Sequence, residues 1–161
     1  RAIWKVTTRV RAAAFLPEKP YPGIRDLPYQ KKPYWHIERS RLGDSRDVTV
    51  EILVNGKAVA QRRLHADGSL KDLAFEVPIE RSSWVAARIL PSSHTNPVWV
   101  TVADRPVRAS RRSAEWCLRG VNDCWKQKEK FIDQDEMEDA RKAYNHARDT
   151  YRRIIGESKA L

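Results

Sequence analysis

The stretch Arg81–Val102 decides the fold, and it reads Arg-Ser-Ser-Trp-Val-Ala-Ala-Arg-Ile-Leu-Pro-Ser-Ser-His-Thr-Asn-Pro-Val-Trp-Val-Thr-Val. From Trp84 to Leu90 the side chains alternate, so one face of the expected strand is strongly apolar and the other is mixed. Pro91 ends this strand because proline has no N–H to donate to a ladder. A polar turn follows, and the alternation resumes from Val98 to Val102. The stretch therefore predicts the core hairpin of a β-sandwich.

Further strands are predicted on the N-terminal side of this hairpin. Their ranges are residues 3–10, 34–42, 48–54, 57–65 and 70–79. The pair Asn55-Gly56 is the strongest two-residue hairpin signal in the chain, because both positions of a type I′ turn need a positive φ. About seven strands with turns roughly every ten residues are typical of an antiparallel β-sandwich. We expect an immunoglobulin-like topology, with a jelly roll as the alternative.

Prolines and tyrosines are frequent in the segment between the first two predicted strands. Its tyrosines are Tyr21, Tyr29 and Tyr34. Tyrosines at this density usually hold a loop against a surface. We therefore expect a structured excursion that crosses a sheet, in place of a disordered linker.

After Pro106 the spacing of apolar residues changes from a period of two to one of about 3.6, which is typical of amphipathic helices. The residues that can begin or end two helices are Ser110 or Ser113, Asp133 or Asp135, and Gly156. The second helix has a heptad-like seam whose small alanines permit close approach. We predict a sandwich domain at residues 1–108 and, at residues 109–161, an antiparallel helical hairpin packed on that sandwich.

The composition narrows the range of partners. The chain has 161 residues and a net charge of +10, but its Lys and Arg residues are dispersed among 21 acidic residues. A nucleic-acid interface usually concentrates its basic residues in a stripe or a recognition motif, so we predict no nucleic-acid partner. No stretch of about 20 apolar residues is present, so we expect no membrane span. The only methionine is Met137, and the chain reads as a piece of a longer protein, which leaves its cellular location open.

The two cysteines, Cys117 and Cys124, lie seven residues apart in the first predicted helix. Two helical turns rise about 10 Å, which is too far for a disulfide between them. The spacing also differs from zinc and redox motifs. Both thiols fall on the apolar face of the helix, so we expect buried, free cysteines that act as small hydrophobic residues.

The sequence contains no local catalytic motif. The four histidines are isolated from one another, so His-x-His and His-Glu-x-x-His zinc motifs are absent. A Gly-x-Ser-x-Gly elbow and a phosphate-binding glycine loop are absent as well. We therefore predict no catalytic residue, no metal ligand and no cofactor in this chain. A metal site assembled in space from His94 and His36 is an alternative hypothesis.

Aromatic and polar residues indicate a ligand-binding surface. The candidates are His94, Asn96, Trp35, Trp99 and His36. Carbohydrate-binding sandwiches stack sugars on exposed aromatic rings, so a carbohydrate-binding module is one hypothesis. The alternative for the tryptophans is packing in the core, which is common in β-sandwiches. The alternative for His94 is a turn histidine that bonds the backbone.

Several motifs of this chain resemble a known family. They are Lys32–Glu38, Asn55-Gly56, the run Ser-Trp-Val-Ala-x-Arg at Ser83–Arg88, the run His-Thr-Asn-Pro-Val-x-Val at His94–Val100, Ser110–Cys117, and Ala143-Tyr144 with Tyr151 in the helix pair. Together they resemble the C-terminal region of bacterial PHP-type metallohydrolases of the CehA/McbA kind. In that family this region is a β-sandwich that follows a catalytic barrel, and the barrel carries the metal-binding His-x-His motifs.

The resemblance implies a non-catalytic accessory domain of a larger metal-dependent hydrolase, with a structural or substrate-positioning role. The family's catalytic motifs lie on an N-terminal barrel that this sequence does not contain, so no catalytic residue is carried over. The implied partner is the N-terminal catalytic domain of the same polypeptide. Any divalent metal is expected in that domain, and this chain is not expected to be an enzyme by itself.

Overall fold

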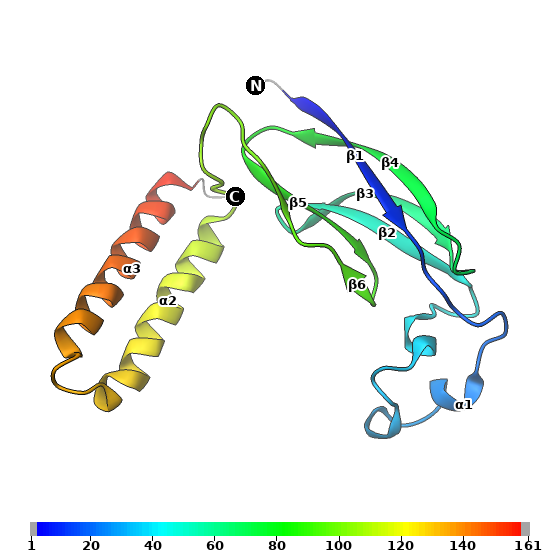
Figure 1. The fold of residues 1–161 in the computed structure, drawn as a ribbon, viewed down its shortest axis with the longest axis horizontal. Coiled ribbons are helices and arrows are strands. Elements are labelled where there is room, and N and C mark those ends of the chain that lie inside the picture. Colours follow the sequence, from blue (N-terminus) through cyan, green and yellow to red (C-terminus); the bar gives the residue numbers. More distant parts are fainter. Residues whose placement is uncertain (1–2, 159–161) are drawn as a thin grey trace. The chain divides into compact units, whose positions relative to one another are not determined.

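The computed structural model describes residues 3–158, and it divides the chain into two compact units, Arg1–Ala103 and Asp104–Leu161. The first, which we call the two-sheet unit, is mainly β, and the second, the helical unit, is built from helices (Figure 1). The division falls just before Pro106, where the spacing of apolar residues changes in the sequence. A mainly β chain with a C-terminal helical region is therefore confirmed.

The strands of the two-sheet unit form two antiparallel sheets. One sheet consists of β1 (Trp4–Ala12) and β4 (Lys71–Ile79). The strands of the other sheet are β2 (Asp47–Val54), β3 (Lys57–His65), β5 (Ser83–Ile89), β6 (Ser93–His94) and β7 (Val98–Val100). Their order is β3-β2-β5-β6, and β7 also pairs with β5. The chain thus changes sheet between β1 and β2, between β3 and β4, and between β4 and β5.

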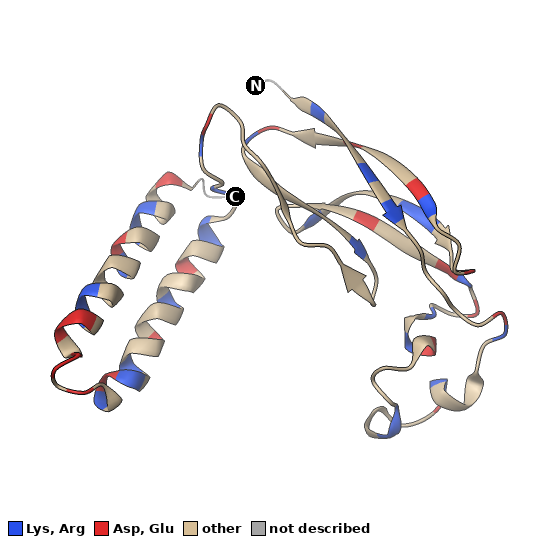
Figure 2. Ribbon diagram, in the orientation of Figure 1, with Lys and Arg blue, Asp and Glu red and all other residues tan. Residues whose placement is uncertain are grey.

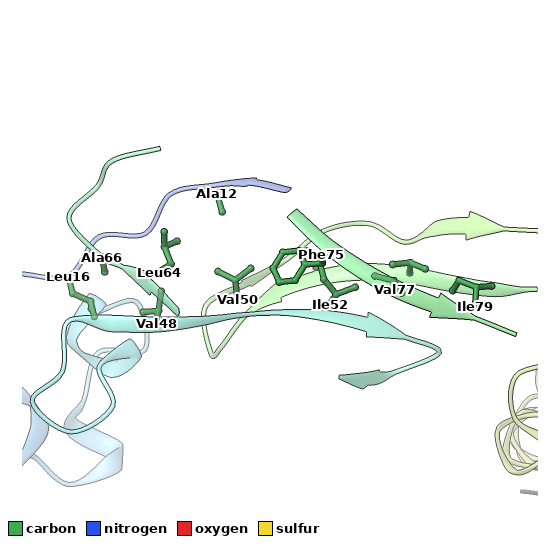
Figure 3. Packing of buried hydrophobic residues seen from close by; sticks show 12 residues of the cluster. Ala12, Leu16, Val48, Val50, Ile52, Leu64, Ala66, Phe75, Val77 and Ile79 are labelled. Carbon is green, nitrogen blue, oxygen red and sulfur yellow. The ribbon is translucent and has the colours of Figure 1, made fainter. Parts of the chain in front are cut away.

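A single hydrophobic cluster joins the two sheets. Phe75, Val77 and Ile79 of β4 pack in one cluster with Val50 and Ile52 of β2, and all five side chains are almost fully buried (Figure 3). Alternation with a period of two predicts this arrangement, because the intervening residues of each strand point the other way. Removing such a side chain from water stabilises the fold by about 1.5–3 kcal/mol. The strands predicted at residues 48–54 and 70–79 are confirmed.

The predicted core hairpin forms, but with an additional strand. β5 ends at Ile89, before Pro91. The sequence predicts an irregular turn there, whereas β6 pairs with the end of β5, and the Thr95 hydroxyl accepts a hydrogen bond from the Ala87 amide at 3.1 Å. β7 lies alongside the start of β5 and ends at Val100, earlier than expected. A side-chain to backbone bond therefore keeps the polar turn on the sheet.

The strand predicted at residues 34–42 is wrong. This part of the chain contains a short 3-10 helix, η2 (Ile37–Ser40). The His36 ring caps η2 by accepting a hydrogen bond from the Glu38 amide at 3.2 Å. A local cap of this kind favours a helical turn over an extended strand. The other short helices of this excursion between β1 and β2 are α1 (Pro22–Arg25) and η1 (Tyr29–Lys31) (Figure 1).

The turn between β2 and β3 forms as predicted. Asn55 and Gly56 have φ angles of 51° and 86°, both in the left-handed region. The Asn55 side chain also reaches β5: its Oδ1 accepts a hydrogen bond from the Trp84 amide at 3.1 Å, and its Nδ2 donates to Ser83 Oγ at 3.0 Å. The turn therefore fixes the end of the β2–β3 hairpin against the start of the neighbouring strand.

The helical unit contains two long helices. Its elements are α2 (Arg111–Lys128), the 3-10 helix η3 (Glu129–Phe131) and α3 (Met137–Glu157). Ser110 caps α2 by accepting a hydrogen bond from the Ser113 amide at 3.1 Å, which selects Ser110 over Ser113 as the cap. The cap predicted for α3 at Asp133 or Asp135 is wrong, because Glu136 is the N-cap residue and makes no side-chain bond. The predicted stop at Gly156 is also wrong, because α3 continues to Glu157.

The seam between α2 and α3 pairs cysteines with tyrosines. Cys124 Sγ lies 3.1 Å from the Tyr144 hydroxyl, and that hydrogen bond raises the pKa of Tyr144. The electrostatic interaction with Cys117, followed by a hydrogen bond between the two side chains, raises the pKa of Tyr151. Both cysteines are free and half-buried, so they are less enclosed than the sequence predicts. Among residues 3–158, no helix has the length and apolar character to cross a membrane.

Replacing Gly56 with alanine will destabilise the two-sheet unit by about 1 kcal/mol, because a Cβ at this positive φ is strained. Asparagine tolerates the left-handed region better than alanine, so Gly56→Asn will cost less. Urea unfolding followed by tryptophan fluorescence measures both variants. Equal losses of stability in the two variants would contradict the backbone explanation and would point to side-chain crowding in the turn.

Candidate functional site

The turn after β5 brings two of the predicted ligand residues together. His94 ends β6 and Asn96 follows two residues later, and both side chains are exposed. The Nδ1 atom of His94 lies 3.1 Å from the carbonyl oxygen of Thr95. Because that carbonyl can only accept, it favours the tautomer with the proton on Nδ1 and leaves Nε2 as an acceptor. His94 is therefore a turn histidine whose ring bonds the backbone on one side and faces solvent on the other.

Trp99 lies on the strand that follows this turn. It stands opposite Trp84 in the register between β7 and β5, and its side chain is 63% exposed. Trp84 is half-buried. Trp99 therefore places an exposed aromatic ring within a few residues of His94 and Asn96 in the chain, and Trp84 is its cross-strand neighbour.

Trp35 and His36 lie in a different segment, the excursion between β1 and β2. Trp35 is 72% exposed and packs edge-to-face on Tyr34, with 4.8 Å between ring centroids. The His36 ring lies 6.1 Å from the ring of Tyr21 and accepts the capping bond of η2. Trp35 and His36 thus contact aromatic residues of the excursion, whereas Trp99 stands opposite Trp84 and His94 lies on β6.

A buried ion pair that the sequence analysis misses holds the excursion in place. Arg41 Nε and Nη2 donate to the Glu38 carboxylate at 2.7 and 2.9 Å, and the two side chains are only 1% and 5% exposed. Arg41 also donates to the carbonyl oxygens of Pro17 and Ser45. The guanidinium group holds the pKa of Glu38 below its usual range. The spacing of opposite charges at i and i+3 was the available signal.

A hollow of about 240 Å³ lies between the end of β1 and the β5–β6 edge. Its polar lining includes Arg11, Arg88 and His94, and its apolar lining includes Val50 and Ala87 from the core. The two guanidinium groups are already neutralised, since Arg88 bonds Glu51 and Arg11 bonds Asp72, at 2.6 and 2.8 Å respectively. The hollow therefore has apolar side chains at its base, and the two arginines at its margin are already paired with carboxylates.

The described part of the chain gives the metal hypothesis no further ligands. Within residues 3–158, no group of three or more His, Cys, Asp or Glu side chains is close enough to hold a metal ion. His36 and His94 therefore share no third ligand of these types there. Each ring has a bond of another kind: His36 to the Glu38 amide, and His94 to the Thr95 carbonyl.

The fold defines a class, a two-sheet antiparallel β unit followed by a helical pair. No protein-family model matches this chain, and no curated protein or solved structure matches it either.

The Glu38–Arg41 pair predicts acid-sensitive stability. Folding lowers the pKa of Glu38, so its ionisation stabilises the fold above the unfolded pKa near 4.3, and this contribution disappears as the pH falls through the lower folded pKa. Glu38→Gln will lose about 3 kcal/mol at pH 7, because Arg41 remains buried without a counter-charge. Its stability will also fall less than that of the wild type between pH 5 and pH 3. Urea unfolding across this pH range measures both effects.

Glu76→Gln is the matched control, because Glu76 forms an exposed ion pair with Lys5 at 3.6 Å. Exposed pairs contribute about 0–1 kcal/mol, so this variant will resemble the wild type. A Glu38→Gln variant as stable as Glu76→Gln at pH 7 would show that the buried pair does not hold the excursion.

Proposed function

We propose that this chain is a non-catalytic accessory domain of a larger PHP-like metal-dependent hydrolase, and that it packs on the catalytic domain of the same polypeptide. The proposal assigns the divalent metal and the chemistry to that catalytic domain, and a structural or substrate-positioning role to this chain. One observation carries it. Three of the segments that resemble the family each present an exposed tryptophan: Trp35 and Trp99, described above, and Trp116, which is 68% exposed.

Exposed motif residues need an explanation other than folding. Tryptophan is among the most buried side chains on average, and burying it releases a large apolar area from water. A motif that serves only the core would place its aromatic residues inside, as β4 does with Phe75. Motifs whose tryptophans lie outside are better explained by a surface that another protein domain covers.

We infer that the two-sheet unit is an immunoglobulin-like sandwich. In that fold strands B and E share one sheet, and strands C and F pair in the other, flanked by C′ and G. The pairing of β1 with β4, and the order β3-β2-β5 with β7 beside β5, support this assignment with β1 as strand B. A jelly roll has eight strands in two Greek keys, and the short two-stranded sheet gives it less support.

Hydroxyl-radical footprinting with mass spectrometry tests the accessory role. Trp35, Trp99 and Trp116 will be labelled several-fold less in the full-length polypeptide than in the isolated chain, because the catalytic domain covers them. Trp84 and Trp125 are half-buried within the chain itself and serve as internal references. Equal labelling of the three exposed tryptophans in both proteins would sink the proposal.

A second candidate function, carbohydrate binding, is favoured by the turn after β5. Trp99 supplies an exposed ring, and His94 and Asn96 supply exposed polar groups a few residues away. Sugars are commonly held by stacking on an aromatic face together with hydrogen bonds to their hydroxyl groups. This function needs the isolated chain to bind a glycan without a partner domain.

Affinity electrophoresis in gels containing a panel of soluble polysaccharides tests carbohydrate binding. If the turn binds sugars, at least one polysaccharide will retard the chain, and Trp99→Ala will abolish the retardation because the stacking ring is lost. Trp116→Ala, in the helical unit, is the matched control and will leave the retardation unchanged. Unretarded migration on every polysaccharide would remove this candidate and leave the accessory role.

A further inference from the structure

The free edge of β1 is the feature that the proposed function leaves unused. Within residues 3–158, β1 pairs with β4 alone, so one side of this nine-residue strand has no neighbour in the sheet. An unpaired edge presents a row of backbone N–H and C=O groups that another strand can pair with. The sheet of β1 and β4 is two strands wide, and its stability comes from packing on the larger sheet.

The hollow described above borders this edge. Its lining takes Val10, Arg11 and Ala12 from β1 and Ser93 and His94 from β6, and it takes no residue from β4. A strand added to β1 would direct every second side chain toward the space between the sheets. The hollow has about 240 Å³ and a floor of core side chains, which suits small apolar groups. A single added strand could therefore pair with the edge of β1 and place its side chains in the hollow.

The outer face of β1 is basic and therefore favours acidic residues on an added strand. Lys5, Arg9 and Arg11 occupy alternating positions along it, and all three are exposed. Figure 2 shows the basic positions spread along the ribbon of β1. Lys5 and Arg11 have acidic partners on β4, whereas the residue opposite Arg9 is Ala74. Acidic residues on a neighbouring strand would face these cations across the free edge, and opposite charges in such cross-strand positions are favourable.

The other edge of this small sheet and a second copy of the chain fit less well. Within residues 3–158, β4 pairs with β1 alone, and β4 contains Pro78, which cannot donate to a ladder. Two copies of the chain joined through β1 in antiparallel fashion would set the row of Lys5, Arg9 and Arg11 beside the same row. Like charges in that position are destabilising.

We propose that the free edge of β1 binds an extended segment of a partner protein in which acidic residues alternate with small apolar ones. The segment adds to the sheet as a third strand antiparallel or parallel to β1, with its acidic side chains beside Arg9 and its apolar side chains over the hollow. Main-chain hydrogen bonds supply affinity, and the alternation supplies specificity. This inference rests on the unpaired edge of β1 and the hollow beside it, and it does not depend on the proposed accessory role.

The probe for this site is a fluorescein-labelled nine-residue peptide that alternates glutamate and valine, and its binding is followed by fluorescence anisotropy. Two further peptides carry N-methyl groups on the amides of either the glutamates or the valines. Successive amides of a strand point to opposite edges, so one methylated peptide will lose binding and the other will retain it. Arg9→Glu will weaken binding of the unmodified peptide about fivefold.

Lys57→Glu is the matched variant. It makes a similar charge change on β3, which is an edge strand of the larger sheet and does not pair with β1. It will bind the peptide as the wild type does, and circular dichroism will confirm that both variants are folded. Absence of binding, equal effects of the two methylation patterns, or equal effects of the two substitutions would overturn the proposal. So would a dimer of the free chain that protects the β1 amides from hydrogen exchange, because it would identify a second copy as the occupant.

Discussion

The two-sheet unit depends on apolar contact between strands that share no hydrogen bond. β2 and β4 belong to different sheets, and only the packing of residues such as Val50 and Phe75 joins them. The hydrophobic effect has no direction of its own, so the alternation along each strand decides which side chains enter the cluster. Once that face is buried, a register shift by one residue would expose it, which fixes the pairings at the sheet edges.

Polar side chains then fix the segments that carry the candidate residues. Arg41 holds the excursion, Asn55 holds the β2–β3 turn against β5, and Thr95 holds the turn that contains His94. In each case a side chain satisfies backbone groups or a buried charge that would otherwise be unpaired. The exposed aromatic residues therefore stand on segments with defined positions, although they contribute little to the core. This separation of surface from core supports the proposal that they contact a partner domain or a ligand.

The helical unit buries its apolar residues less completely than the two-sheet unit does. Its seam contains half-buried thiols and tyrosines, and Ala114 is the buried residue of α2. The pair Cys124 and Tyr144 shows that the small, weakly polar thiol can fill such a seam while accepting or donating one hydrogen bond. Trp116 lies on the exposed side of the same helix. Within this unit, as in the two-sheet unit, aromatic surface is left outside the packed layer.

The sequence by itself determined the strands with strict alternation and the Asn55-Gly56 turn, because these follow from the period of two and from the φ angles of two residues. It limited the cap of α2 to Ser110 or Ser113, and the structure selected Ser110. Residues 34–42 were decided by both levels. The His36 cap is local, whereas the burial of Arg41 also depends on the carbonyl of Pro17, which lies far away in the chain. Tertiary structure also decided that Trp35 and Trp99 are exposed and that, within residues 3–158, β1 pairs with β4 alone. Exposure and edge pairing depend on contacts between residues far apart in the chain, which no local pattern records.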